Sequence, residues 1–417
     1  MKQPDANDEL QRRLRSLGDH LTPRSPSGGI TTAADKSPSR YHRLAVAVGG
    51  ELRTLPNGAI CVVGRTCRWG ERIGNAILSA PTAQPEIRLA SFQGEETAET
   101  LLPAELLFFD CETTSLGGAG SVAFLVGCGF VTSAGFTVRQ YLLPDYSDEA
   151  ALLEAVLAEF QPHRTLVSFN GVTFDAPILR DRLIVNRVAR ELPCRRHIDL
   201  LPASRRLFRR RLADCRLTTL EQELFSFFRE DDIPGYLVPS VYFDWLHTEN
   251  TAQLAAVVRH NYWDILSMYL LLMHINRVFV EEGAPLSHTE DVYSLSRVYG
   301  RRGRHEKVVA LLDEVRQAQQ VTPEVTWFHS LALKRSGDWT EAVAAWKELL
   351  GTGTRESVWA AIELAKYCEH RTRSYHEALQ YARLALRNRS VPSSLRQAVA
   401  HRVSRLERKL TACLSSK

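Results

Sequence analysis

The sequence lacks the signatures of several large protein classes. Its eight cysteines include no Cys-x-x-Cys pair, which argues against a zinc knuckle or a dithiol redox motif. No apolar run approaches the roughly 20 residues needed to cross a bilayer, and the first residues, MKQPDANDELQRRLRSLGDH, contain no apolar core of a signal peptide. The net charge is only +4, which permits a polyanionic partner without predicting one. We therefore expect a cytoplasmic protein with reduced thiols and no membrane partner.

Composition divides the chain of 417 residues into four segments. Residues 1–40 are rich in Ser, Pro, Arg, Asp and Gly, which predicts a disordered basic and polar tail. Residues 41–100 contain short β-like runs and glycine turns, which predict a small β-rich extension. Residues 101–282 begin with hairpin-like strands and continue with strand–helix alternation. This order predicts an α/β domain in which helices flank a mixed sheet.

The last segment, residues 288–415, contains three similar stretches: GRHEKVVALLDEV, GDWTEAVAAWKEL and RSYHEALQYARLAL. Their glutamates Glu306, Glu341 and Glu377 recur at spacings of 35 and 36 residues. This is close to the ~34-residue period of tetratricopeptide repeats. The pattern predicts an all-α helical-repeat domain, and a helical bundle without repeats is the alternative.

Two acidic residues stand at the end of an apolar run. The run Leu106–Phe109 reads as a buried strand, and Asp110 and Glu112 follow it. Because side chains alternate between the two faces of a strand, both carboxylates point the same way. Carboxylates so close together repel each other unless a cation lies between them. Since hard divalent cations prefer oxygen ligands, the pattern predicts a metal site.

Two later acids have contexts that suit the same site. Asp175, in SFNGVTFDAPIL, lies between a predicted strand and a predicted helix, at the sheet edge where α/β proteins place their sites. A helix cap explains Asp175 equally well when it is taken alone. Asp264, in RHNYWDILSM, shares a helix face with His260 four residues earlier. Carboxylates and a histidine are the parts used for phosphodiester hydrolysis with two Mg²⁺ or Mn²⁺ ions, in which the histidine accepts a proton from water.

These residues resemble a known family. The order Asp-x-Glu, Asn…Phe-Asp and His-x-x-x-Asp is similar to that of the DEDD exonuclease superfamily, which has a ribonuclease H-like fold. More closely, residues 41–280 resemble the bacterial YprB-like ribonuclease H-like proteins, through the segments DCETTSLGGAGSVAFLVG, SFNGVTFDAPILRDR, HIDLLPASRRLFRRRL, CRLTTLE, DIPG and VVRHNYWDILSM.

The resemblance implies roles for these residues. It makes the carboxylates of Asp110, Glu112, Asp175 and Asp264 metal ligands, and His260 the general base. The sequence departs from the pattern in two respects. Ser115 stands where the family commonly has Gly, which concerns only the local turn, and three residues separate His260 from Asp264, a spacing typical of the tyrosine subtype. His260 therefore stands where the tyrosine subtype has its tyrosine. Tyr262 is a weaker candidate for the base, because two residues along a helix turn it away from Asp264.

Several residues are candidate contacts to nucleic acid. The span Arg195–Arg211 carries seven arginines and one acid, and arginine forks suit phosphate groups. We expect Arg205, Arg206 and Arg209 to contact the backbone of the strand, with a solvated helix face as the alternative.

The remaining candidates have competing structural explanations. Asn170 binds the substrate or holds its own turn, and Thr113 is a further candidate contact beside the carboxylates. Asp199 is a second acid near the site or a helix cap, with the cap favoured. Phe169 and Phe174 would stack on bases or pack in the core, with packing favoured.

Taken together, the residues and the resemblance predict a nuclease that requires two Mg²⁺ or Mn²⁺ ions. The resemblance alone implies a 3′–5′ exonuclease that acts on single-stranded nucleic acid, with repeats that recruit a protein partner. The alternative from another class is a non-catalytic adaptor that binds nucleic acid and recruits its partner through the repeats. A third possibility is an endonuclease that cuts RNA–DNA hybrids.

Overall fold

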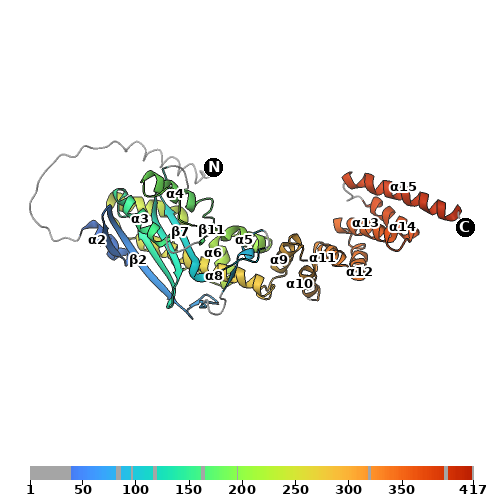
Figure 1. The fold of residues 1–417 in the computed structure, drawn as a ribbon, viewed down its shortest axis with the longest axis horizontal. Coiled ribbons are helices and arrows are strands. Elements are labelled where there is room, and N and C mark those ends of the chain that lie inside the picture. The colour runs from blue at the N-terminus through green and yellow to red at the C-terminus, as the bar shows by residue number, and fades with distance from the viewer. Residues whose placement is uncertain are drawn as a thin grey trace, which may run out of the picture. The chain divides into compact units, whose positions relative to one another are not determined.

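The structure is a computed structural model that describes residues 39–80, 86–94, 97–115, 120–160, 165–194, 196–317, 321–388 and 393–415 (Figure 1). The tail predicted for residues 1–40 therefore lies almost wholly outside the described residues. The chain from Arg40 to Lys417 forms one unit by its internal contacts.

A mixed sheet of seven strands forms the centre of the α/β region, as predicted. Its spatial order is β1 (Glu51–Leu55), β2 (Gly58–Arg68), β9 (Gly135–Leu142), β8 (Ala123–Val131), β7 (Leu106–Thr113), β10 (Thr165–Ser168) and β11 (Arg196–Asp199). Neighbouring strands are antiparallel from β1 through β7, whereas β7, β10 and β11 run parallel. β7 is therefore the strand that has an antiparallel neighbour on one side and a parallel neighbour on the other.

Residues 41–100 differ from the small β-rich extension that we expected. Their described part begins with helix α2 (Arg40–Val48), and β1 and β2 join the main sheet as its edge. The reason is that β2 pairs with β9 from Cys61 to Arg68, so its apolar residues complete the central core. The short strands β3 (Arg72–Ile73), β4 (Ala76–Ile77), β5 (Ile87–Arg88) and β6 (Thr100–Leu101) form two separate ladders.

Helices cover both faces of the sheet (Figure 1). Phe108 of β7 packs against Tyr269 of α8 (Leu254–Val280), with ring centroids 5.8 Å apart. The next residue, Phe109, packs on the opposite face against Phe160 of α3 (Glu149–Phe160), at 5.7 Å. The face of Phe108 also contacts α5 (Leu200–Phe208) and α6 (Leu217–Phe225), whereas that of Phe109 contacts α2, α4 (Asp175–Val185) and α7 (Val238–Thr248).

The remainder of the described chain is all-α, as predicted. Its helices are α9 (Thr289–Arg301), α10 (His305–Gln317), α11 (Pro323–Ser336), α12 (Trp339–Leu349), α13 (Arg355–His370), α14 (Tyr375–Arg387) and α15 (Ser393–Ser415). Glu306, Glu341 and Glu377 each lie in the first turn of the second helix of a consecutive pair. Among the helices described, none combines the length and the apolar character that crossing a membrane requires.

Candidate active site

Strand β7, an interior strand of the sheet, carries two of the predicted site residues. Leu106 and Phe108 belong to the core on the α8 side, and Leu107, Phe109 and Cys111 belong to the core on the opposite side. The same alternation turns Asp110 and Glu112 toward α8. The prediction that the two carboxylates share a face is thus confirmed. Cys111 between them is 6% exposed and packs in the core on the opposite side.

Helix α8 approaches β7 closely and contributes the next group of side chains. Asn261 is fully buried, and its Nδ2 donates to Asp110 Oδ2 at 2.8 Å while its Oδ1 accepts from Gln140 Nε2 at 2.8 Å. The approach is possible because Gly127 lies opposite Asp110 in the sheet. A Cβ atom at Gly127 would collide with Asn261 and with Ile265.

His260 and Asp264 lie one turn apart on α8, as their spacing predicts. The distance from His260 Nε2 to Asp264 Oδ2 is 3.4 Å, and His260 Nδ1 lies 2.8 Å from Asp232 Oδ1. Among the described residues, one set of possible metal-ligating side chains places its atoms within 4.8 Å of one another: Glu112, His260 and Asp264. Asp232 therefore fixes the orientation of an imidazole that faces two carboxylates.

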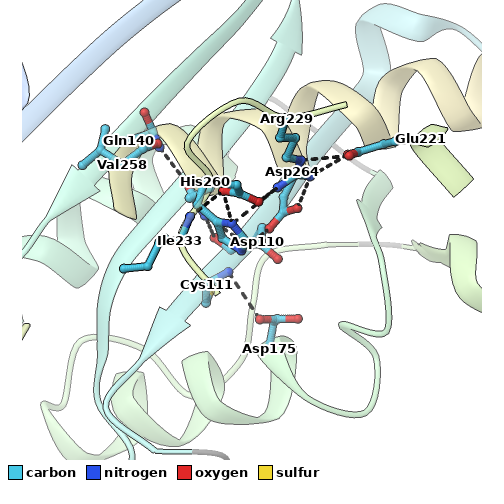
Figure 2. A network of polar contacts seen from close by, with 12 residues as sticks. Asp110, Cys111, Gln140, Asp175, Glu221, Arg229, Ile233, Val258, His260 and Asp264 are labelled. Atoms are coloured by element: carbon cyan, nitrogen blue, oxygen red, sulfur yellow. Dashed lines mark hydrogen bonds and ion pairs between the residues drawn. The ribbon is translucent and has the colours of Figure 1, made fainter. Parts of the chain in front are cut away.

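A buried arginine is the main feature of the site that the sequence analysis missed. Arg229 follows α6 in a loop, its side chain is only 3% exposed, and its Nη2 lies 2.6 Å from Asp264 Oδ1 (Figure 2). The same guanidinium binds both carboxylate oxygens of Glu221, at 2.5 Å and 2.8 Å, and lies 3.4 Å from Asp232. The only sequence signal is the segment FREDDIPG, where a charge run between two helices reads equally well as a solvated loop.

Asp175 reaches the site from the other side of β7. It is the first residue of α4 and 5% exposed, and its Oδ1 accepts a hydrogen bond from the backbone N–H of Cys111 at 3.3 Å (Figure 2). Its predicted position at a strand-to-helix junction is therefore confirmed. Neither Asp175 nor Asp110 belongs to the described set within 4.8 Å, so the four predicted carboxylates surround the site without all touching one point.

The electrostatics of this cluster are those of crowded, buried acids. Burial raises the pKa of Asp110 well above its usual value, and the neighbouring charges of Asp264, Asp175 and Glu112 raise it further. Burial likewise raises the pKa of Glu112 to about 8 and that of Asp175 to about 7. A cation bound among these oxygens would favour the ionised carboxylates. The donor set, carboxylate oxygens with one imidazole, fits Mg²⁺ or Mn²⁺.

The negative charges that disfavour the ionised carboxylates favour the charged forms of His260 and Arg229. Burial lowers the pKa of His260, but the carboxylates of Asp264, Glu112 and Asp232 outweigh it, so the net pKa is raised. For Arg229 burial also acts to lower the pKa, and Asp264 and Glu221 reverse the effect. Arg229 is therefore a permanent positive charge within the acid cluster.

The other predicted residues occupy varied positions. Thr113 is 7% exposed and its hydroxyl donates to the Ser115 carbonyl at 2.7 Å. The side chain of Asn170 accepts from Thr173 Oγ1 at 3.1 Å, in agreement with a role in its own turn, where the backbone φ is 67°. Tyr262 is 8% exposed and lies beneath the guanidinium of Arg65, away from the carboxylates.

Asp199 is the N-cap of α5, as favoured, because its Oδ1 accepts from the backbone N–H of Leu201 at 3.0 Å. The same oxygen accepts from the backbone N–H of Asn170 at 2.8 Å, so it also holds the loop that leads to Asp175. Phe169 packs against the core, as expected for the favoured explanation. The three predicted arginines lie on and just after α5, with Arg205 and Arg209 exposed and Arg206 half-buried.

Comparison with known proteins adds three findings. The model of the RNase_H superfamily matches residues 107–276. The chain is 34% identical over 314 residues to the uncharacterized protein YprB of Bacillus subtilis (strain 168), a match that covers 74% of this chain and 75% of YprB. It is also similar to the family B DNA polymerase of the hyperthermophilic archaeon Pyrobaculum calidifontis, with a TM-score of 0.33 and 17% identity, over 62% of this chain and 35% of the polymerase.

Proposed function

Because the chain belongs to the family of Bacillus subtilis YprB and carries an RNase_H superfamily domain, we propose that it is a nuclease that depends on divalent metal ions. The observation that carries the proposal is the convergence of Asp110, Glu112, Asp175 and Asp264 from three separate elements. Glu112 and Asp264 place ligand atoms within 4.8 Å of each other, and Asp175 accepts a hydrogen bond from the backbone N–H of Cys111, the residue between Asp110 and Glu112. Such an accumulation of like charge inside a fold is stabilised by cations.

The residues have distinct roles in this proposal. The four carboxylates hold two Mg²⁺ or Mn²⁺ ions, which when bound supply an activated water and stabilise the charge that develops on the phosphate. His260 accepts the proton of the attacking water at Nε2, the ring nitrogen that faces Asp264. Asp232 accepts from Nδ1, at 2.8 Å, and so keeps the accepting nitrogen turned toward the site.

We propose a 3′–5′ exonuclease that acts on single strands, and this polarity rests on the resemblance to DEDD exonucleases. Thr113 is the last residue of β7 and Asn170 follows β10 by two residues, and both serve as contacts to the terminal nucleotides. Arg205, Arg206 and Arg209 contact phosphates further along the strand.

The test uses end-labelled single-stranded RNA and DNA, incubated with Mn²⁺, Mg²⁺ or EDTA. The expected result is a metal-dependent ladder from the 3′ end that disappears in Asp110→Asn. The matched control is Asp181→Asn, which makes the same change at an exposed residue of α4 and should leave the ladder intact. Internal cuts in an RNA–DNA hybrid would show instead that the protein is an endonuclease.

One observation favours the adaptor as a second candidate. Arg229 already pairs with Asp264, so part of the negative charge that a metal ion would balance is balanced by the protein itself. In an adaptor, Mn²⁺ would leave the thermal midpoint of the unmodified protein unchanged. In a metalloenzyme, Mn²⁺ raises this midpoint, and Asp110→Asn reduces the rise.

We further propose that the helix pairs from α9 to α14 are tetratricopeptide-like repeats that bind a protein partner. The support is the recurrence of Glu306, Glu341 and Glu377 at equivalent places in the second helices. The segment 101–282 would then be the nuclease domain and 288–415 the repeat domain. Cross-links to a partner confined to residues 40–280 would contradict this assignment.

A further inference from the structure

A cavity of about 540 Å³ lies between α5 and α9, and arginine side chains dominate its lining. We call it the arginine pocket and define it by six residues: Arg205, Arg206, Arg209, Arg210, Arg297 and Arg301. The first four belong to the end of α5 and the residues after it, and the last two belong to α9. The pocket is thus built jointly by the ribonuclease H-like region and the first helix of the all-α region.

Few acids balance these charges. Arg210 pairs with Glu324 at 3.0 Å and stacks over the ring of Tyr293 at 4.8 Å. Within the described part of the chain, no ion pair joins an acid to Arg205, Arg209, Arg297 or Arg301. The pocket therefore gathers six guanidinium groups around a cavity with one paired acid at its edge.

Local effects do not account for this arrangement. A helix C-terminus favours a basic residue in its last turn, and both α5 and α9 end beside the pocket. That effect explains about one cation at each helix end, within the last turn. It does not explain why two helices distant in sequence direct their arginines into one cavity, where the charges repel each other. The pKa of Arg206 reflects the crowding, because burial lowers it and Arg302 and Arg301 lower it further.

The pocket is connected to the candidate active site through α5. This helix starts at Asp199, whose carboxylate holds the backbone of Asn170 in the loop before Asp175. The 9 residues of α5 span about 14 Å, so the arginines lie within a few nucleotides' reach of that loop. Guanidinium forks match the geometry of phosphate oxygens.

We propose that the arginine pocket binds the phosphodiester backbone of the single strand whose end occupies the active site, an inference that rests on the proposed nuclease function. Arg297 and Arg301 then make the all-α region part of the nucleic-acid site and not only a platform for proteins. The substrate class is a strand long enough to reach from the carboxylates to α9.

The test is equilibrium binding of a fluorescently labelled single strand of about 16 nucleotides, the upper range for one binding groove. All proteins carry Asp110→Asn, so that no cleavage intervenes. The pocket variant is Arg297→Gln/Arg301→Gln. Its matched control is Arg383→Gln/Arg387→Gln, which removes the same charge from α14.

The pocket variant is expected to bind the strand more weakly. The slope of its log Kd against the logarithm of the salt concentration should fall by about 1.4, at about 0.7 for each lost phosphate contact. The control should lose less on both measures. Since the substitutions relieve repulsion between like charges, the thermal midpoint of the pocket variant should not fall, which separates lost binding from misfolding. Equal affinity and equal salt dependence in the two variants would overturn the proposal.

A competition arm with tripolyphosphate distinguishes a strand from a small anion. If tripolyphosphate raises the thermal midpoint of the unmodified protein but does not displace the strand, the pocket binds small anions and the proposal fails. The outcome for the nuclease is separate. If the unmodified protein cleaves and the pocket variant binds the strand as before, only the pocket proposal is refuted. If the pocket variant binds more weakly and the unmodified protein does not cleave, only the nuclease proposal is refuted.

Discussion

Replacement of Arg229 by methionine tests how the acid cluster is stabilised. Methionine keeps most of the length of the side chain and removes its charge. Glu221, which is 1% exposed, then loses the guanidinium that binds both of its oxygens, at 2.5 Å and 2.8 Å, and Asp264 loses its partner at 2.6 Å. Removal of one partner from a buried ion pair destabilises a protein by about 3–5 kcal/mol, because the other charge stays buried.

For a domain of this size, that loss corresponds to a fall of about 6 to 20 °C in the thermal midpoint. Differential scanning calorimetry at neutral pH measures it. The control is Arg53→Met, which breaks an exposed pair with Glu51 and should change stability by less than about 1 kcal/mol.

A double variant identifies the cause. In Arg229→Met/Glu221→Met the buried carboxylate is removed together with its partner, and apolar replacement of both members of a buried pair is often neutral. We therefore expect the double variant to recover most of the lost midpoint. A single variant that melts like the unmodified protein, or a double variant no more stable than the single one, would refute the reasoning.

Three further predictions concern the helix contact, the pH dependence and base stacking. Gly127→Ala should lower stability by about 1 to 3 kcal/mol, because the added Cβ collides with Asn261, the residue bound to Asp110. The same shift of Asn261 should reduce the stabilisation by Mn²⁺. Calorimetry with and without Mn²⁺ measures both effects. Burial, assisted by Arg277, lowers the pKa of His274 from 6.5 to about 4, so the stability that its neutral form contributes is complete above pH 6.5 and is lost as the pH falls toward 4. His274→Leu should reduce this loss of stability at acid pH by up to about 3 kcal/mol. Urea unfolding at pH 6.5 and at pH 4 measures the loss, and an equal loss in the variant and the unmodified protein would contradict the prediction. Tyr236, which is 75% exposed in a short 3-10 helix (Gly235–Leu237) after Asp232, should stack on a base. Tyr236→Ala should weaken single-strand binding by about 1 to 3 kcal/mol while Tyr236→Phe retains it, and equal Kd values for the two variants would exclude stacking.

The local features of the site were predictable because they depend on short-range geometry. The pleat of a strand decides that Asp110 and Glu112 share a face, and the pitch of a helix decides that His260 and Asp264 share another. The apolar run before Asp110 is enough to predict a buried strand, which is β7, an interior strand of the sheet.

The partners of these residues were not predictable in the same way. Arg229 belongs to a loop without periodicity, and Asn261 reads as an ordinary polar residue of an amphipathic helix. Each acquires its role only because α8 lies against the sheet at Gly127 and the loop after α6 folds over the acids. The edge strands β1 and β2 were assigned to a separate extension for the same reason, since their pairing with β9 is a long-range contact.

The sequence by itself determined the mixed sheet flanked by helices, the all-α region after it and the residue types of the acid cluster, because these follow from patterns within a few turns or strands. Tertiary structure alone decided which charges meet. It brought the guanidinium of Arg229 to Asp264 and gathered the arginines of α5 and α9 around one cavity. The physical reason is that Coulomb interactions depend on distance in space, which the order of residues does not specify.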